Sequence, residues 1–278
     1  MPRPAISWNP ARYLHSALHG GYPVLEDWLA QAYVLGLRFV EVHQALLPSR
    51  APEMLRQIRR RLEGHELRVC LLTCAPDFTH PEPLVREAHF HDMLGMLDVA
   101  KLLGAPCLRV TAGCQHDAVS RDDGLIWCAE LIQRLADAAQ RAGLKLALEN
   151  HFRDRTWHAP DFAHEPEVFL EVCRRTRSSP LGISFDTSHP LLSATDPLAV
   201  LEPVKERVCH LRASDRFPGQ HGHTVVGDGA VDFDAVFGCL AQAGFTGAIS
   251  VEDGSPEGDE GLERGLRFVR AKVAQWWP

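Results

Sequence analysis

The stretch Leu146-Ala-Leu-Glu149-Asn150-His151 joins an apolar run to polar groups at its C-terminal end. An apolar run gains free energy by burial, so its backbone is held in place. A carboxylate or imidazole at the end of such a run stands at a rim, where neighbouring strands can direct ligands to one point. The same design recurs in Gly182-Ile-Ser-Phe-Asp186-Thr-Ser-His189, in Arg207-Val-Cys-His210-Leu-Arg212-Ala-Ser-Asp215 and in Ala248-Ile-Ser-Val-Glu252-Asp253.

Apolar segments alternate with longer segments of helical period, as in parallel strands joined by crossover helices. The predicted strands cover residues 5–8, 38–42, 68–73, 107–111, 145–149, 181–186, 208–213 and 247–252. The predicted helices lie near residues 25–35, 52–63, 85–103, 120–142, 166–177, 196–204, 233–243 and 260–274. Eight such units match the closure of a barrel. We therefore predict an α/β fold, a single (β/α)8 TIM barrel that forms one domain over residues 1–278.

The composition of the chain limits the classes of partner and the cellular compartment that we expect. The 278 residues are 45% hydrophobic and 23% charged, and the net charge of −7 disfavours a nucleic-acid partner. No apolar run is long enough to cross a bilayer, and the first residues lack the apolar core of a signal peptide. The eight cysteines are scattered, which is typical of free thiols in a reducing compartment. We expect a cytoplasmic protein with no membrane partner.

Barrel closure would bring the polar strand ends together. Glu149, Asp186 and Glu252 end the fifth, sixth and eighth predicted strands, and His210 lies near the end of the seventh. Carboxylates this close repel one another unless a cation neutralises them. Oxygen ligands with one imidazole suit Mn, Mg, Co or Zn, so we predict one divalent metal ion as the cofactor.

These residues resemble the xylose isomerase-like TIM barrels, which include sugar isomerases and epimerases, inosose-processing enzymes and the endonuclease IV branch. The resemblance covers essentially the whole chain and is most specific from Leu146 to Gly254. It implies that Glu149, Asp186 and Glu252 bind the metal. It also implies that His189, three residues after Asp186, binds substrate or a further metal. Similar barrels are usually homodimers or homotetramers.

The seventh strand departs from the family pattern. The family's metal-binding histidine stands three residues before an acidic residue, here Asp215, and that position is Arg212. His210 shares a strand face with Arg212 but lies about 6.5 Å deeper along the strand. Either a shifted or bulged strand lets His210 bind the metal, which we favour slightly, or Arg212 takes the position and binds an anionic substrate.

A further set of histidines follows in the loop His221-Gly-His223. It resembles the family segment that, in endonuclease IV, helps to hold an additional metal beside the equivalent of His189. His189, His221 and His223 are therefore candidates for a second metal site. The alternative, that they lie in an exposed loop or contact sugar hydroxyls, is favoured because His-x-His alone is a weak signal.

The predicted activity is that of a metal-dependent sugar isomerase or epimerase in carbohydrate metabolism. A metal that chelates a carbonyl and an adjacent hydroxyl stabilises the enediolate formed when the intervening carbon loses a proton. The resemblance implies that Glu149 and Glu252 transfer this proton. The expected partner is a small-molecule sugar or cyclitol ketone, and the expected substrate-binding residues are Trp8, His189, Arg212, Arg216 and His223.

Three other functions compete with this prediction. A dehydratase of an inosose or a dehydroshikimate-like ketone would share the proton removal and then expel a β-hydroxyl. An abasic-site endonuclease needs two more histidines on early strands, where the chain has Leu72-Thr-Cys-Ala75 and Val110-Thr-Ala-Gly113. A non-catalytic binding barrel would follow if Arg212 replaced the metal outright.

Overall fold

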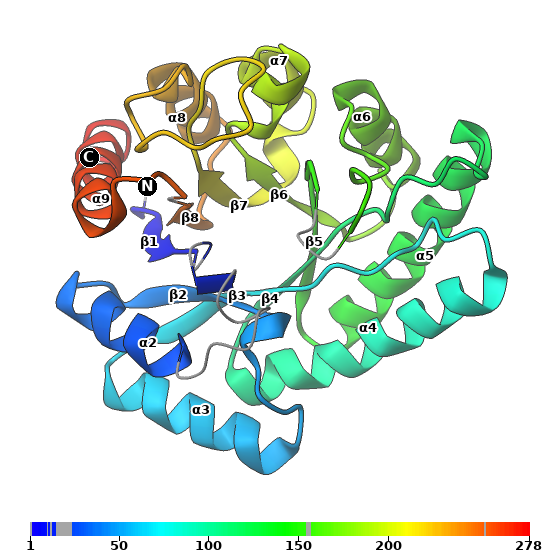
Figure 1. The fold of residues 1–278 in the computed structure, drawn as a ribbon, viewed down its shortest axis with the longest axis horizontal. Coiled ribbons are helices and arrows are strands. Elements are labelled where there is room, and N and C mark those ends of the chain that lie inside the picture. The colour runs from blue at the N-terminus through cyan, green and yellow to red at the C-terminus, as the bar shows by residue number, and fades with distance from the viewer. Residues whose placement is uncertain (1, 10, 12, 15–23, 154–156, 253) are drawn as a thin grey trace.

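The computed structural model describes residues 2–9, 11, 13–14, 24–153, 157–252 and 254–278. Eight parallel strands form one sheet in the order β1-β8-β7-β6-β5-β4-β3-β2, whose two end strands meet to close the ring. Figure 1 looks along this ring, with the helices packed around its outside. The predicted (β/α)8 barrel is therefore confirmed. The strands are β1 (Ala5–Trp8), β2 (Phe39–His43), β3 (Arg68–Thr73), β4 (Cys107–Val110), β5 (Lys145–Glu149), β6 (Gly182–Asp186), β7 (Val208–Ala213) and β8 (Ala248–Val251).

Most helices begin and end where the sequence indicates. Proline occupies the first turn of four helices, where its missing N–H costs nothing, and Gly104 ends one of them with a left-handed φ of 78°. The helices are α2 (Val24–Val34), α3 (Pro52–Gly64), α4 (Pro83–Leu103), α5 (Arg121–Arg141), α6 (Pro166–Arg175), α7 (Pro197–Leu201), α8 (Phe233–Gln242) and α9 (Gly258–Trp276). None of the helices in the described part of the chain is long and apolar enough to span a membrane.

The region after β6 differs from the prediction. A helix was expected over residues 196–204, but α7 ends at Leu201 and a separate 3-10 turn follows at Lys205–Arg207. Pro203 has no backbone N–H with which to continue the helical hydrogen-bond pattern, so the helix ends early although Glu202 still has helical angles. A second 3-10 turn, His189–Ser193, begins directly after β6 and fixes the backbone of His189 beside the strand end.

A bulge in β7 decides which of its side chains faces the barrel mouth. Ile183 pairs with Val208, but the next residue of β6 pairs with His210, so Cys209 is the extra residue. A Cβ on Gly182 would lie 2.5 Å from the Cys209 sulfur, and one on Gly247 would lie 2.0 Å from its carbonyl oxygen. The bulge therefore requires two glycines, and it places Arg212 level with Asp186.

Candidate functional site

Glu149, the last residue of β5, is a fully buried carboxylate between two arginines. Arg109 Nε donates to its Oε2 at 2.6 Å, and Arg212 Nη1 lies 2.8 Å from the same oxygen. Burial by itself would raise the pKa of Glu149, but the two guanidinium groups outweigh it and hold the pKa well below its usual range. Glu149 is therefore ionised throughout the physiological pH range.

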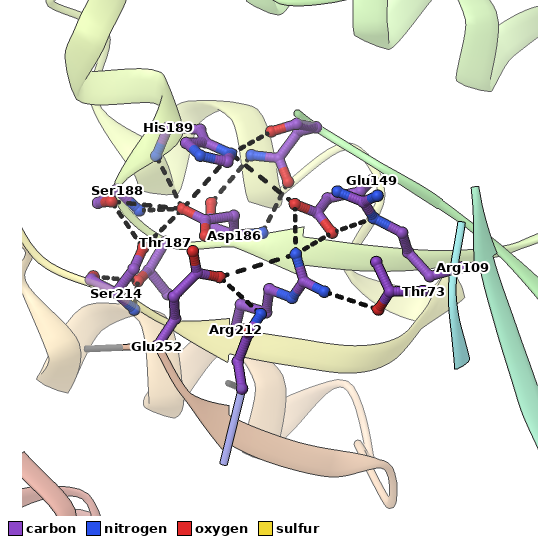
Figure 2. Close-up of polar contacts among 12 residues, drawn as sticks. Thr73, Arg109, Glu149, Asp186, Thr187, Ser188, His189, Arg212, Ser214 and Glu252 are labelled. Atoms are coloured by element: carbon purple, nitrogen blue, oxygen red, sulfur yellow. Dashed lines mark hydrogen bonds and ion pairs between the residues drawn. The ribbon is translucent and has the colours of Figure 1, made fainter. Parts of the chain in front are cut away.

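Asp186 ends β6 with its two carboxylate oxygens in different environments. Oδ1 accepts hydrogen bonds from the backbone N–H groups of Ser188 and His189, both at 2.9 Å, and from Ser214 Oγ at 2.7 Å (Figure 2). Oδ2 is buried and has no hydrogen-bond partner among the described residues. A buried carboxylate oxygen without a partner is costly unless a ligand or ion completes it.

His189 is held beside both carboxylates by the 3-10 turn. Its Nδ1 lies 3.0 Å from the carbonyl oxygen of Asn150, 3.7 Å from Asp186 Oδ1 and 3.9 Å from Glu149 Oε1. Burial lowers the pKa of His189, which favours the neutral imidazole that a metal requires. In the described part of the chain, Glu149, Asp186 and His189 are the group whose ligand atoms all lie within 4.8 Å of one another and could hold a metal ion.

Glu252 follows β8 and lies near Arg212 at the barrel mouth, outside the group of Glu149, Asp186 and His189. Asn9 Nδ2 donates to its Oε2 at 2.9 Å, and Arg212 Nη1 lies 3.7 Å from the same oxygen. Burial raises the pKa of Glu252, and the charges of Asp186 and Glu149 add to this shift, against the opposing charge of Arg212. The environments of Glu149 and Glu252 thus push their pKa values in opposite directions.

Arg212 occupies the end of β7 that faces the carboxylates. Figure 2 shows its guanidinium between Glu149 and Glu252. Nη2 donates to Glu41 Oε2 at 2.6 Å and to Thr73 Oγ1 at 3.0 Å. The neighbouring carboxylates raise the pKa of Arg212 against the effect of burial, so the guanidinium is a fixed cation.

His210 lies deeper in the barrel than Arg212, because the register of β7 sets it opposite Ser184 and Ala248. Its Nε2 lies 2.8 Å from Glu41 Oε1, and it is not part of the Glu149, Asp186 and His189 group. The β7 bulge precedes His210 and does not lift it to the mouth. The structure therefore places Arg212, and not His210, in the ligand register of this strand.

A cavity of about 250 Å³ opens above these groups and is lined by Glu252, His189, Arg212 and the basic residues of two loops. Trp8, expected in its wall, is fully buried against Tyr13 and Trp28 in the core instead. The indole points outward from β1 to Trp28 of α2, whereas the next residue, Asn9, faces the other way and lines the cavity.

The loop after β7 is fixed by Asp215. This buried carboxylate accepts backbone N–H groups from four loop residues, at 2.9 to 3.1 Å: Arg216, Gly227, Gly229 and Val231. A Cβ on Gly229 would lie only 2.2 Å from Asp215 Oδ1, so glycine alone permits this approach. The loop thereby presents Arg216, His221 and His223 to the cavity.

The histidines proposed for a second metal are not brought together in the described structure. The ring of His221 packs 5.1 Å from that of Phe152, and His223 Nε2 lies 2.8 Å from Arg216 Nη2. Neither joins His189 in a group that could hold an ion. A guanidinium bound to His223 instead directs this part of the loop toward polar or anionic ligands.

Arg109 and Glu41 belong to the site although the sequence analysis did not single them out. Both are buried, and both complete the ion-pair network around Arg212 and Glu149. Arg109 carried a usable signal, because Cys107-Leu-Arg-Val110 is an otherwise apolar strand interrupted by one charge. A buried arginine needs a buried anion, so such a charge marks a partner elsewhere in the barrel.

The residues fit a divalent cation. Asp186 offers an unsatisfied oxygen, Glu149 is ionised and His189 is favoured as neutral imidazole. The carboxylates of the inner site outnumber its arginines, so a cation would not be repelled: they are Glu41, Glu149, Asp186, Asp215 and Glu252, against Arg109, Arg212 and Arg216. Arg212 reduces this excess of negative charge, which should weaken metal binding without preventing it.

Comparison with known proteins agrees with the architecture. The model of the xylose isomerase-like TIM barrel family matches residues 29–272. The chain belongs to this family. Among solved structures, this xylose isomerase-like barrel superposes on a D-tagatose 3-epimerase-like protein with a TM-score of 0.77 and 17% identity, covering 98% of each chain. An IOLI protein with a bound zinc atom gives a TM-score of 0.77 and 18% identity, covering 98% of this chain and 99% of that one.

Curated relatives of the xylose isomerase-like barrel match over shorter regions. An inosose dehydratase of Lacticaseibacillus casei is 26% identical over 141 residues, which is 44% of each protein. An inosose isomerase of Bacillus licheniformis is 23% identical over 176 residues, or 59% of each protein. The chain spans about half the length of the curated relatives it matches.

Proposed function

We propose that this protein is a metal-dependent sugar isomerase or epimerase that moves a proton at a carbon next to a carbonyl. The observation that carries the proposal is the pair Glu149 and Glu252, whose pKa values are shifted in opposite directions: Glu149 belongs to the group able to hold a cation, and Glu252 lies outside it. Two carboxylates with divergent pKa values are the usual basis for assigning acid and base roles. Membership of the xylose isomerase-like family and the names of its relatives support the same class.

Glu149, Asp186 and His189 would hold the ion. When bound, the ion would polarise the carbonyl and the adjacent hydroxyl of a ketose, which increases the acidity of the carbon between them. Glu149 would stay ionised and fix the geometry through Arg109 and Arg212. Glu252, whose pKa is raised, would exchange its proton more readily near neutral pH.

Arg212 would assist the proton transfer electrostatically. Its Nη1 lies 2.8 Å from Glu149 and 3.7 Å from Glu252, so it faces both acidic groups. A fixed cation in a buried site stabilises negative charge that develops on substrate or on Glu252 without solvent reorganisation. The guanidinium is already oriented by Glu41 and Thr73, so it does not have to be ordered during the reaction.

A dehydratase is the second candidate, and the family relatives named inosose dehydratase favour it. Both reactions begin with proton removal next to a carbonyl and diverge only if a β-hydroxyl is positioned to leave. Incubation of the manganese-loaded protein with ketoses and inososes in deuterium oxide separates them. Deuterium at the carbon without loss of water supports the isomerase, whereas a new enone absorbance supports the dehydratase. Neither product with any ketone tested would reject both.

A further inference from the structure

We propose that Arg216 forms a carboxylate-binding subsite, so that the substrate is a hydroxy-ketone bearing a carboxylate. This inference rests on the proposed function for the ketone part of the substrate and adds the charge and the place of its other end. It distinguishes Arg216 from Arg212, since either arginine could have served this purpose on sequence grounds.

Arg216 is a buried cation that no described carboxylate contacts directly, although Asp186, Glu252 and Asp215 act on it at longer range. It is only 3% exposed and lines the cavity, yet no carboxylate forms an ion pair with it in the described structure. Arg109 and Arg212, which are equally buried, are both ion-paired with Glu149. A charge removed from water is unfavourable unless an opposite charge accompanies it. The contrast indicates that the anion for Arg216 comes from a ligand.

The neighbours of Arg216 orient its guanidinium and leave some of its N–H donors available to a ligand. Nε donates to Ser188 Oγ at 2.8 Å, Nη1 to the carbonyl oxygen of His221 at 3.3 Å, and Nη2 to His223 Nε2 at 2.8 Å. All three acceptors are uncharged in this arrangement. A guanidinium has five N–H donors, so one on each Nη atom is not used by the described residues. A guanidinium binds both oxygens of a carboxylate when it offers one donor to each of them.

The position of Arg216 is built into the fold. Its own backbone N–H is bound by Asp215, the same carboxylate that anchors the rest of the loop. Ser188, which accepts from Nε, also donates its backbone N–H to Asp186. The anion subsite is thus linked through a single residue to the group that would hold the cation, as expected if one small molecule contacts both.

The charge around Arg216 favours a monoanion over a dianion. Asp186, Glu252 and Asp215 lie close enough to act on its guanidinium. These carboxylates repel an incoming anion, and they repel a phosphate ester, with a charge near −2, more strongly than a carboxylate.

Binding of unreactive probes tests the subsite without turnover. D-gluconate and D-glucitol differ in having a carboxylate or a hydroxymethyl group at one end, and D-glucitol 6-phosphate supplies the phosphate arm. By calorimetry on the manganese-loaded protein, we expect gluconate to bind about tenfold or more tightly than either other probe. Arg216→Gln should abolish this preference, and Arg216→Lys should keep part of it. Arg153→Gln, which alters an exposed arginine at the cavity mouth, should leave it intact.

Several results would overturn the subsite. Equal binding of gluconate and glucitol to the wild type would do so, as would tighter binding of the phosphate ester or a preference that survives in a folded Arg216→Gln protein. The outcome is separable from that of the proposed function. If deuterium exchange occurred only with neutral ketoses, the carboxylate subsite would be rejected and the isomerase proposal retained. If gluconate binding depended on Arg216 but no ketone exchanged deuterium, the subsite would be retained and the isomerase proposal rejected.

Discussion

The Nη2 atom of Arg212 lies 2.6 Å from Oε2 of Glu41, inside the barrel and away from solvent. This ion pair holds the guanidinium at the end of β7, where the family resemblance implied an imidazole. A permanent cation therefore sits beside the carboxylates that would bind the metal. We therefore propose that this guanidinium and a bound ion would compete for Glu149.

Replacing Arg212 by histidine should increase the affinity for divalent metal by about tenfold or more, because it removes a positive charge next to Glu149 and adds a possible ligand. Titration of the chelator-treated protein with manganese, followed by calorimetry, measures this directly. Arg212→Lys keeps the charge and is the matched control, expected to bind metal no better than the wild type. Unchanged affinity in a folded Arg212→His protein would remove Arg212 from the account of metal binding.

Replacing Glu252 by glutamine should reduce deuterium exchange into substrate by about 10²- to 10⁴-fold, because the variant lacks the group that exchanges the proton. Metal affinity should change little, since Glu252 is not in the group of residues whose ligand atoms lie close together. Glu149→Gln should instead lower both quantities. If Glu252→Gln retained exchange within a few-fold of the wild type, another residue would have to carry the proton.

The lowered pKa of Glu41 leads us to expect a steep loss of folding free energy in acid. Burial would raise its pKa, but Arg212 and His210 lower it to about 2, from 4.5 in the unfolded chain. A group with a lowered folded pKa adds stability above the unfolded pKa and loses it as the pH falls through the folded one. The pKa difference corresponds to about 3 kcal/mol, lost between about pH 5 and pH 2. Urea unfolding across this range should show a shallower pH dependence for Glu41→Gln, and parallel curves would contradict the assignment.

Replacing Asp215 by asparagine should destabilise the protein by about 2 kcal/mol or more, since an amide has one acceptor oxygen in place of two and leaves buried loop N–H groups unpaired. Faster proteolysis within the loop that carries His221 and His223 should accompany the loss. Asp234→Asn, at an exposed ion pair with Lys272, is the comparison and should cost less than about 1 kcal/mol. Equal effects of both substitutions would show that Asp215 does not organise the loop.

Much of this architecture follows from local sequence. The strand ends at Glu149 and Asp186 could be located from apolar runs alone, because parallel strands in a barrel bring their carboxyl ends to one face. The position of Arg212 could not, since it depends on a bulge that exists only where Gly182 and Gly247 leave room for Cys209. Such a close approach is a property of packed neighbours and has no local pattern.

Ion pairs that span the barrel could not be predicted from the sequence either, because they too depend on which residues become neighbours in the packed fold. Glu41 and His210 are 169 residues apart in sequence yet only 2.8 Å apart in space. Neither residue type nor sequence spacing indicates such a partner, because barrel closure determines which side chains meet. The early end of α7, by contrast, has a local sequence signal, the proline at position 203.

The guanidinium of Arg212 has a consequence for how the protein matures. A mouth that balances most of its own acidity can assemble before any ion arrives, so completion of the fold and supply of the metal are uncoupled. The metal-free protein would then be fully folded, and it would bind and release the ion reversibly without unfolding of its strands.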